Sequence, residues 1–249
     1  MDKLIYTAAT GLKSHMAAQA AIANNMANGS TIGFRAERIN FDSLILKGPG
    51  FDSRQPASEE VLDFDRTAGT IVSTGRNLDV AVPGDQWMAV QATDGTEAYT
   101  KRGDLQIAAS GVLETGDGFP VMGSGGNPIT VPPTTSISIA NDGTISIVPA
   151  GGDPKNPQVL DRIKFASATG SQTVKGLDNL VHVKGGGVLP QDVDAKCQSG
   201  ALEQSNVNMT QSLVDMIENQ RSYEVQANLM KETKTLDESA ASVMRMPGN

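Results

Sequence analysis

Three pairs of acidic side chains stand close enough in the sequence to suggest acid–base chemistry. They are Glu59 and Glu60, Asp63 and Asp65, and Asp192 and Asp194. A glycosidase needs two carboxylates on opposite sides of a sugar, and spacing along the chain does not establish that arrangement. No separate hydrolase-like segment accompanies the pairs. The sequence therefore favours solvated loop carboxylates, predicts no catalytic residue and leaves a carbohydrate-active enzyme as the weakest alternative.

The remaining short motifs lack the context that their chemistry requires. Gly185, Gly186 and Gly187 are not followed by the Lys-Ser/Thr of a phosphate-binding loop. The Arg-Gly-Asp tripeptide at 102–104 stands between expected strands and indicates a turn. Cys197 is the only cysteine, and the two histidines are far apart, which excludes an intramolecular disulfide and a multi-cysteine metal site. We expect no metal and no cofactor.

The charge balance and the hydropathy pattern narrow the possible partners. The net charge of −8 and the pI near 4.8 make nucleic acid an unsuitable partner, because phosphate binding needs clustered Lys and Arg. No run of about 18 apolar residues is present, so we expect no membrane insertion. The first residues lack the basic and apolar regions of a cleaved Sec signal. We expect a chain that stays in the cytoplasm or leaves it by a route without cleavage.

The elements that position these residues fall into three segments. From about 3 to 28 the chain is rich in Ala, Met and Asn, and its apolar residues recur in a heptad-like pattern that Gln19 interrupts. This pattern predicts an amphipathic helix that ends near Asn28-Gly29. From about 206 a second helix of roughly 35–40 residues is expected, with Ser205 or Asn206 as its N-cap.

The middle of the chain has a different pattern. From about 69 to 190, short β-prone runs such as 78–82, 87–90, 137–139 and 145–148 alternate with turn signals. Asp94-Gly95, Asp117-Gly118 and 141–143 are expected hairpin turns, because Asx and Gly tolerate positive φ. An all-β domain of many short strands follows from this alternation.

Neither terminal helix can bury its narrow apolar stripe alone, so we expect each to use the other as its partner. The predicted fold class is α+β, with long N- and C-terminal helices that pair as a coiled-coil core around a central all-β domain. The predicted segments are an assembly helix with an Asn-rich turn (1–34), an extended or irregular linker (35–68), a β-rich outer domain (69–200) and a C-terminal assembly helix (201–249).

The run from Asn24 to Arg35, NNMANGSTIGFR, resembles a signature of the flagellar rod and hook family. In that signature an N-terminal helix ends in an Asn-rich turn, followed by Ser-Thr-Pro-Gly-Phe and a basic residue. Here Ile32 stands where the family usually has Pro. Gly33 is expected to take a positive φ. The segments 69–82, 99–104, 200–208 and 217–224 also resemble family segments and occur in the family's order.

The resemblance implies a structural protein of the bacterial flagellar basal body rather than an enzyme. The first eight residues are similar to those of proximal rod members, and a distal rod protein is the nearest alternative. The resemblance further implies export by the flagellar type III apparatus without cleavage. It also implies a helical assembly across the periplasm, with the proximal and distal rod proteins and copies of this chain as partners. A non-flagellar β-rich binding module with coiled-coil ends remains a second hypothesis.

The residues expected to carry function are therefore interface residues. The apolar stripes of the two terminal helices are rich in Ala and Met and pack weakly, so we expect these helices to become ordered when several copies pack together. The predicted subunit interface consists of Ile5, Leu12, Met16, Met26, Asn28, Phe34, Asn206, Leu213, Met216, Arg221, Tyr223 and Met230.

Overall fold

The computed structural model describes residues 2–43, 57–153, 155–176 and 178–244 of the 249-residue chain. Two compact units emerge from its contacts. Unit 1 contains 1–27, 37–63 and 208–249, and unit 2 contains 28–36 and 64–207. The chain therefore crosses between the units four times, and each unit is described separately.

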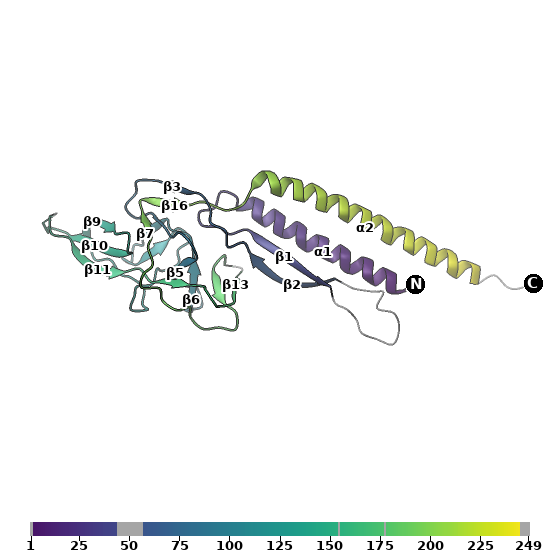
Figure 1. Cartoon of the computed structure of the whole chain (residues 1–249), viewed down its shortest axis with the longest axis horizontal. Helices are drawn as coiled ribbons and strands as arrows, with labels where there is room; N and C mark the ends of the chain where they lie inside the picture. Colours follow the sequence, from purple (N-terminus) through teal and green to yellow (C-terminus); the bar gives the residue numbers. More distant parts are fainter. Residues whose placement is uncertain (1, 44–56, 154, 177, 245–249) are drawn as a thin grey trace, which may run out of the picture. The chain divides into compact units, whose positions relative to one another are not determined.

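Unit 1 consists of two helices and a β-hairpin. Helix α1 (Asp2–Ala27) and helix α2 (Met209–Met244) run antiparallel, and strands β1 (Glu37–Ser43) and β2 (Ala57–Phe64) pair with each other. Figure 1 shows this hairpin beside α1. The expected helix end near Asn28-Gly29 is confirmed. At the start of β1, Oδ1 of Asn25 accepts a hydrogen bond from the Glu37 N–H, and Nδ2 of Asn25 donates one to the Glu37 carbonyl.

The predicted coiled-coil core is wrong. Among the side chains that the structure describes in α1, only Ala8 and Ala21 are buried. The α2 residue Leu213, expected in the seam, is 48% exposed, and Met16 of α1 is 60% exposed. Polar hydrogen bonds instead join the two helices, among them one from Asn219 to the His15 carbonyl. The helices thus pack through small and amide side chains, without the row of interlocking apolar residues that a coiled coil requires.

The segment 35–68 also differs from its prediction as an extended or irregular linker. Strands β1 and β2 lie within it and pair as a two-stranded sheet. The β2 segment, Ala57–Phe64, carries charged residues among its apolar ones and has no simple alternation. Strand β1 does show a short period-2 alternation, with apolar Ile39 and Phe41 between polar residues, so this signal was present in the sequence and was missed. Residues 44–56 lie outside the described part.

Unit 2 is built from short antiparallel strands. A five-stranded sheet has the order β12-β5-β6-β14-β13, a three-stranded sheet has the order β11-β10-β9, and three further pairs are β15-β4, β16-β3 and β7-β8. Their bounds are β3 Ile71–Ser73, β4 Val80–Ala81, β5 Gln86–Gln91, β6 Glu97–Thr100, β7 Leu105–Ile107, β8 Leu113–Thr115, β9 Thr134–Ile139, β10 Thr144–Pro149, β11 Gln158–Arg162, β12 Phe165–Ser167, β13 Thr173–Lys175, β14 Val181–Val183, β15 Gln198–Ser199 and β16 Ala201–Glu203.

Two clusters of buried side chains stabilise unit 2. The larger contains Val80, Met88 and Leu113 among its members. The smaller surrounds Trp87, which is the only tryptophan and meets Phe64 edge-to-face at 5.6 Å between ring centroids. The expected hairpin turns fit this unit, because the glycines at 95, 118 and 143 all have positive φ.

Helix α2 begins later than expected. The Asn208 side-chain oxygen accepts a hydrogen bond from the Gln211 N–H, and the Asn208 carbonyl accepts one from Ser212. Asn208 is therefore the N-cap, and the predicted caps Ser205 and Asn206 are wrong. Asn206 has another task, which is described below.

Candidate subunit interface

The predicted interface residues of α2 lie at different depths. Leu213 and Arg221 are exposed, whereas Met216, Tyr223 and Met230 are half-buried. The three half-buried residues are seven positions apart, a spacing that keeps them on one side of the helix. In α1, Met16 is exposed, and Leu12 and Met26 are half-buried. The side chain of Ile5 lies outside the described part.

Further apolar side chains of α2 are exposed and were not among the predicted interface residues. They include Met209, Val214, Ile217, Val225, Leu229 and Leu236, with exposures from 43% to 67%. Val214, Val225, Leu229 and Leu236 lie on one side of α2, away from the half-buried Met216, Tyr223 and Met230, so a search for the seam between the two helices passes over them. Large apolar side chains gathered on a helix surface typically mark a contact surface.

The contact between the helices is polar. Asn219 donates to the His15 carbonyl at 2.9 Å and to the Gln19 side chain at 2.8 Å, and its oxygen lies 2.8 Å from Nδ1 of His15. The Gln226 amide donates to the Ala8 carbonyl at 3.4 Å. Side-chain hydrogen bonds therefore join α1 and α2 in addition to their apolar contacts.

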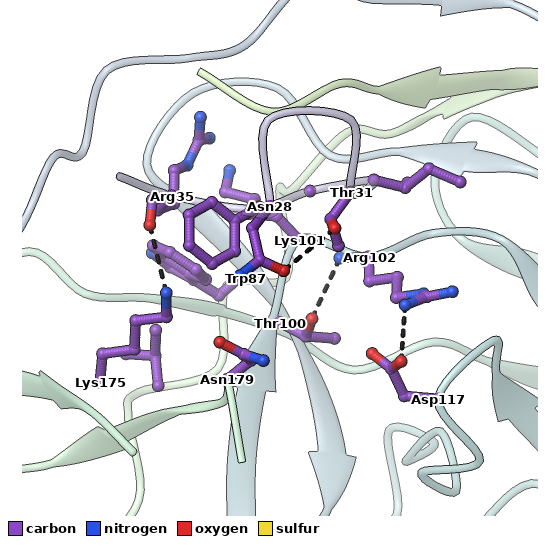
Figure 2. Close-up of a pocket in the computed structure, with 14 residues that line it drawn as sticks. Asn28, Thr31, Arg35, Trp87, Thr100, Lys101, Arg102, Asp117, Lys175 and Asn179 are labelled. Carbon is purple, nitrogen blue, oxygen red and sulfur yellow. Dashed lines mark hydrogen bonds and ion pairs between the residues drawn. The ribbon is translucent and has the colours of Figure 1, made fainter. Parts of the chain in front are cut away.

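The Asn-rich turn at 28–36 lies on the β-rich body of unit 2. Gly33 has φ +69°, as expected, and a Cβ there would lie 2.4 Å from the main-chain carbon of Lys101. Phe34 is buried, with the Lys175 ammonium 3.6 Å from its ring centroid. The same ammonium donates to the Arg35 carbonyl (Figure 2). Phe34 therefore anchors the turn within its own chain.

A buried ion pair holds the end of this turn. The Arg35 guanidinium lies 2.7 Å from the Glu203 carboxylate of β16, and both side chains are at most 3% exposed. Glu203 also accepts the Gly69 N–H, while Arg35 donates to the Thr67 carbonyl. Arg35 Nε and Glu203 Oε2 are buried without a hydrogen-bond partner in the described structure. The pair is thus tightly enclosed and incompletely satisfied.

Lys101 adds a third buried charge nearby. Its ammonium donates to the carbonyls of Val82 at 2.8 Å and Gly84 at 2.6 Å. Burial lowers the pKa of Lys101 from 10.5 to about 8; Glu203 opposes this effect, and Arg35 adds to it. These bonds tie the loop after β4 to the segment under the Asn-rich turn.

Asn206 connects three segments of unit 2. Its side-chain oxygen accepts the Ala36 N–H at 2.7 Å, and its amide donates to the carbonyls of Asp65 and Thr67. The side chain therefore fastens the chain ahead of α2 to the segments that flank the hairpin of unit 1. Asn206 was predicted to lie at an interface between subunits, and its described hydrogen bonds are all within the chain.

A pocket of about 210 Å³ lies between the turn and the strands. Asn28, Thr31, Trp87, Lys101 and Arg102 are among the residues that line it (Figure 2). The Arg102 guanidinium is held by Asp104 and Asp117, so the Arg-Gly-Asp tripeptide is engaged within the chain. The cations at this pocket serve internal contacts.

The other chemical candidates occupy local structural roles. Asp65 accepts the Thr67 N–H, and Asp192 accepts the Asp194 N–H. The side chains of Glu59 and Glu60 lie outside the described part. Burial raises the pKa of the Cys197 thiol to about 11, which disfavours the reactive thiolate. Among the described residues, no cluster of three potential metal ligands is found, and neither helix has the long apolar window of a membrane-crossing segment.

Comparisons with known proteins agree with the sequence signature. Residues 81–147 match the family described as flagellar hook protein FlgE/F/G D1 domain, and residues 198–243 match flagellar basal body rod FlgEFG protein C-terminal. The flagellar basal-body rod protein FlgF of Salmonella typhimurium is 38% identical over 245 residues, and that of Escherichia coli is 37% identical over 246; each alignment covers 96% of both chains. The rod protein FlgG of Bacillus subtilis is 29% identical over 92% of this chain and 94% of its own length.

Proposed function

The chain belongs to the flagellar basal-body rod protein family, and from this membership we propose that it assembles into the rod through its two terminal helices. Its role is that of a structural subunit of the bacterial flagellar basal body. The FlgF relatives from two enteric bacteria share 37–38% identity with it, whereas the Bacillus FlgG shares 29%. This difference favours the proximal rod over the distal rod. Family membership also argues against the non-flagellar binding module.

The exposed apolar surface of α2 is the observation that carries the proposed mode of assembly. Ile217 is 55% exposed, Val225 67% and Leu229 45%. Burial of a large aliphatic side chain contributes about 1.5–3 kcal/mol, so covering several of these residues supplies a substantial driving force. Copies of the same chain and sister rod proteins are the proposed partners, because all carry related terminal segments.

Two further parts of the proposal rest on family membership and chemistry. Delivery by the flagellar type III apparatus, without cleavage, follows from the family. A purely structural role, with no catalytic activity, is supported by the positions of the candidate carboxylates Asp65 and Asp192 in local turns. The net charge of −8 supports partners other than nucleic acid.

Replacement of the exposed apolar residues tests the proposal. In a strain that lacks this chain, a variant with Ile217→Gln, Val225→Gln and Leu229→Gln should fail to restore rod assembly and motility. Val159→Gln is the matched control, because Val159 is 72% exposed but lies on β11. Circular dichroism and Trp87 fluorescence of the purified chains check that folding is unchanged. Full motility with the triple variant would refute assembly through α2.

A further inference from the structure

Two amide side chains of α2 contact the main chain of α1 at matching intervals. Asn219 donates to the carbonyl of His15, and Gln226 donates to the carbonyl of Ala8. The two donors are seven residues apart on α2, and the two acceptors are seven residues apart on α1, in the opposite chain direction. The two hydrogen bonds therefore repeat once per heptad along the antiparallel pair.

Asn219 occupies a site that satisfies most of its hydrogen-bonding capacity. Its Nδ2 donates to the His15 carbonyl and to Oε1 of Gln19, and its Oδ1 lies 2.8 Å from Nδ1 of His15. Because Oδ1 only accepts, the His15 proton lies on Nδ1. Three of the four hydrogen-bonding positions of the amide are thus used, all by α1.

Gln226 lies beside a position that lacks a side chain. A Cβ at Gly11 would lie 2.5 Å from Nε2 of Gln226, and Ala8 next to it is only 3% exposed. A glycine within a helix costs about 0.5–1 kcal/mol relative to alanine. Here the glycine leaves the space in which the Gln226 amide reaches the Ala8 carbonyl.

We propose that Asn219 and Gln226 determine the register of the α1–α2 pair. Apolar contacts among Ala and Met tolerate a slip, because one residue of this kind resembles the next. An amide does not: a slip by one heptad would place Asn219 opposite Ile22 or Ala8, away from Gln19 and His15. Single buried polar residues fix register in helix pairs for the same reason.

The same two amides also fix which side of α2 faces α1, and with it which side faces other molecules. Asn219 and Gln226 turn one side of α2 towards α1 and leave Ile217, Val225 and Leu229 exposed. The two amides are therefore positioning residues for assembly. This consequence rests on the proposed function, whereas the register itself can be measured in the dilute monomer.

Disulfide trapping in the full chain tests the register. Interpolation between the two hydrogen bonds places Leu12 opposite Ser222, which is exposed, so the adjacent half-buried Tyr223 is chosen as its partner. A slip by one heptad brings Met216 or Met230 to this level. Chains with Leu12→Cys and a second cysteine at 223, 216 or 230 are oxidised at low concentration. Cys197 is buried, and a chain with only this cysteine supplies the blank. The 12–223 disulfide should form at least about ten-fold faster than the slipped ones, which corresponds to about 1.4 kcal/mol.

The amides are then replaced in each of these chains. Asn219→Leu with Gln226→Leu should reduce the preference for the 12–223 disulfide to below about three-fold. Gln211→Leu with Gln220→Leu is the matched control, because these exposed α2 amides donate to Asp215 and Glu224 of their own helix. The control should retain the preference.

Two outcomes would overturn the proposal. The first is a 12–223 disulfide that is no faster than the slipped ones in the unaltered helices. The second is an unchanged preference after both amides are replaced, which would assign the register to the anchors at Phe34 and Asn206. Gly11→Ala provides an independent variant, because its methyl group displaces the Gln226 amide without removing it, and it should weaken the preference partially. Loss of assembly with a normal register would instead contradict the proposed function alone.

Discussion

The buried pair of Arg35 and Glu203 offers a sharp test of how the Asn-rich turn is held. Glu203→Gln keeps the shape of the side chain but leaves the Arg35 charge enclosed without a counter-charge. Loss of one partner of a buried pair typically costs about 3–5 kcal/mol. For a urea dependence of about 2 kcal/mol per molar, the unfolding midpoint of unit 2 should fall by about 1.5–2.5 M.

The only tryptophan, Trp87, is 4% exposed in unit 2, so its fluorescence follows unfolding of this unit separately from the helices. Replacement of both charges, with Arg35→Met and Glu203→Leu, should cost less than Glu203→Gln alone. The pair is incompletely hydrogen-bonded, and water can reach the exposed Thr67 and the half-buried Gly69 after their partners are lost. A midpoint shift below about 0.5 M for Glu203→Gln, or a double variant as unstable as the sum of both single variants, would refute this reasoning.

Three further predictions concern the same unit. Because the pKa of Lys101 is lowered to about 8, the unfolded chain binds more protons than the folded chain between pH 8 and 10.5. The free energy of unfolding should therefore rise with pH in this window, by up to about 3 kcal/mol relative to the Lys101→Met variant. Urea unfolding of both chains at pH 7 and pH 10 measures this difference. Gly33→Ala should lower the free energy of unfolding by at least about 2 kcal/mol in the same assay, because the added Cβ meets the main chain of Lys101. Gly75 also has positive φ but is surrounded by open space, so Gly75→Ala should cost about 1 kcal/mol. Equal losses in the two variants would contradict the steric argument. Cys197 should react with iodoacetamide at pH 7.5 only after denaturation, since burial raises its pKa to about 11; rapid labelling of the folded chain would contradict this assignment.

Local signals in the sequence were sufficient where one residue type dictates the backbone. The end of α1 at Asn28-Gly29 and the positive φ of Gly33 follow from the conformational freedom of glycine. The short strands of unit 2 follow from turn chemistry and β-prone runs. The N-cap of α2 was placed wrongly because Ser205, Asn206 and Asn208 are all good caps, and only the tertiary bonds of Asn206 to Ala36 and Thr67 decide among them.

The buried charges could not be predicted because each depends on distant partners. Arg35 meets Glu203, and Lys101 meets the carbonyls of Val82 and Gly84. In the sequence, Arg35 was only the basic residue that ends a motif, and Glu203 was a residue that precedes a helix. No periodic pattern carries information on such pairs, since a pattern describes one element and the ion pair joins two.

The error over the coiled coil has a specific physical origin. A search for apolar periodicity assigns the α2 contact to apolar residues alone, namely Leu213, Met216, Tyr223 and Met230. The structure instead directs Asn219 and Gln226 to α1 and leaves Leu213 48% exposed. One signal was available in the sequence: Gln19 interrupts the α1 stripe, and it is the residue that receives the Asn219 amide. A polar residue within an apolar stripe is therefore better interpreted as a contact with a polar partner than as a defect of the stripe. By this interpretation α2 has two separate surfaces: a polar one, which we propose sets the register, and an exposed apolar one, which we propose other subunits cover.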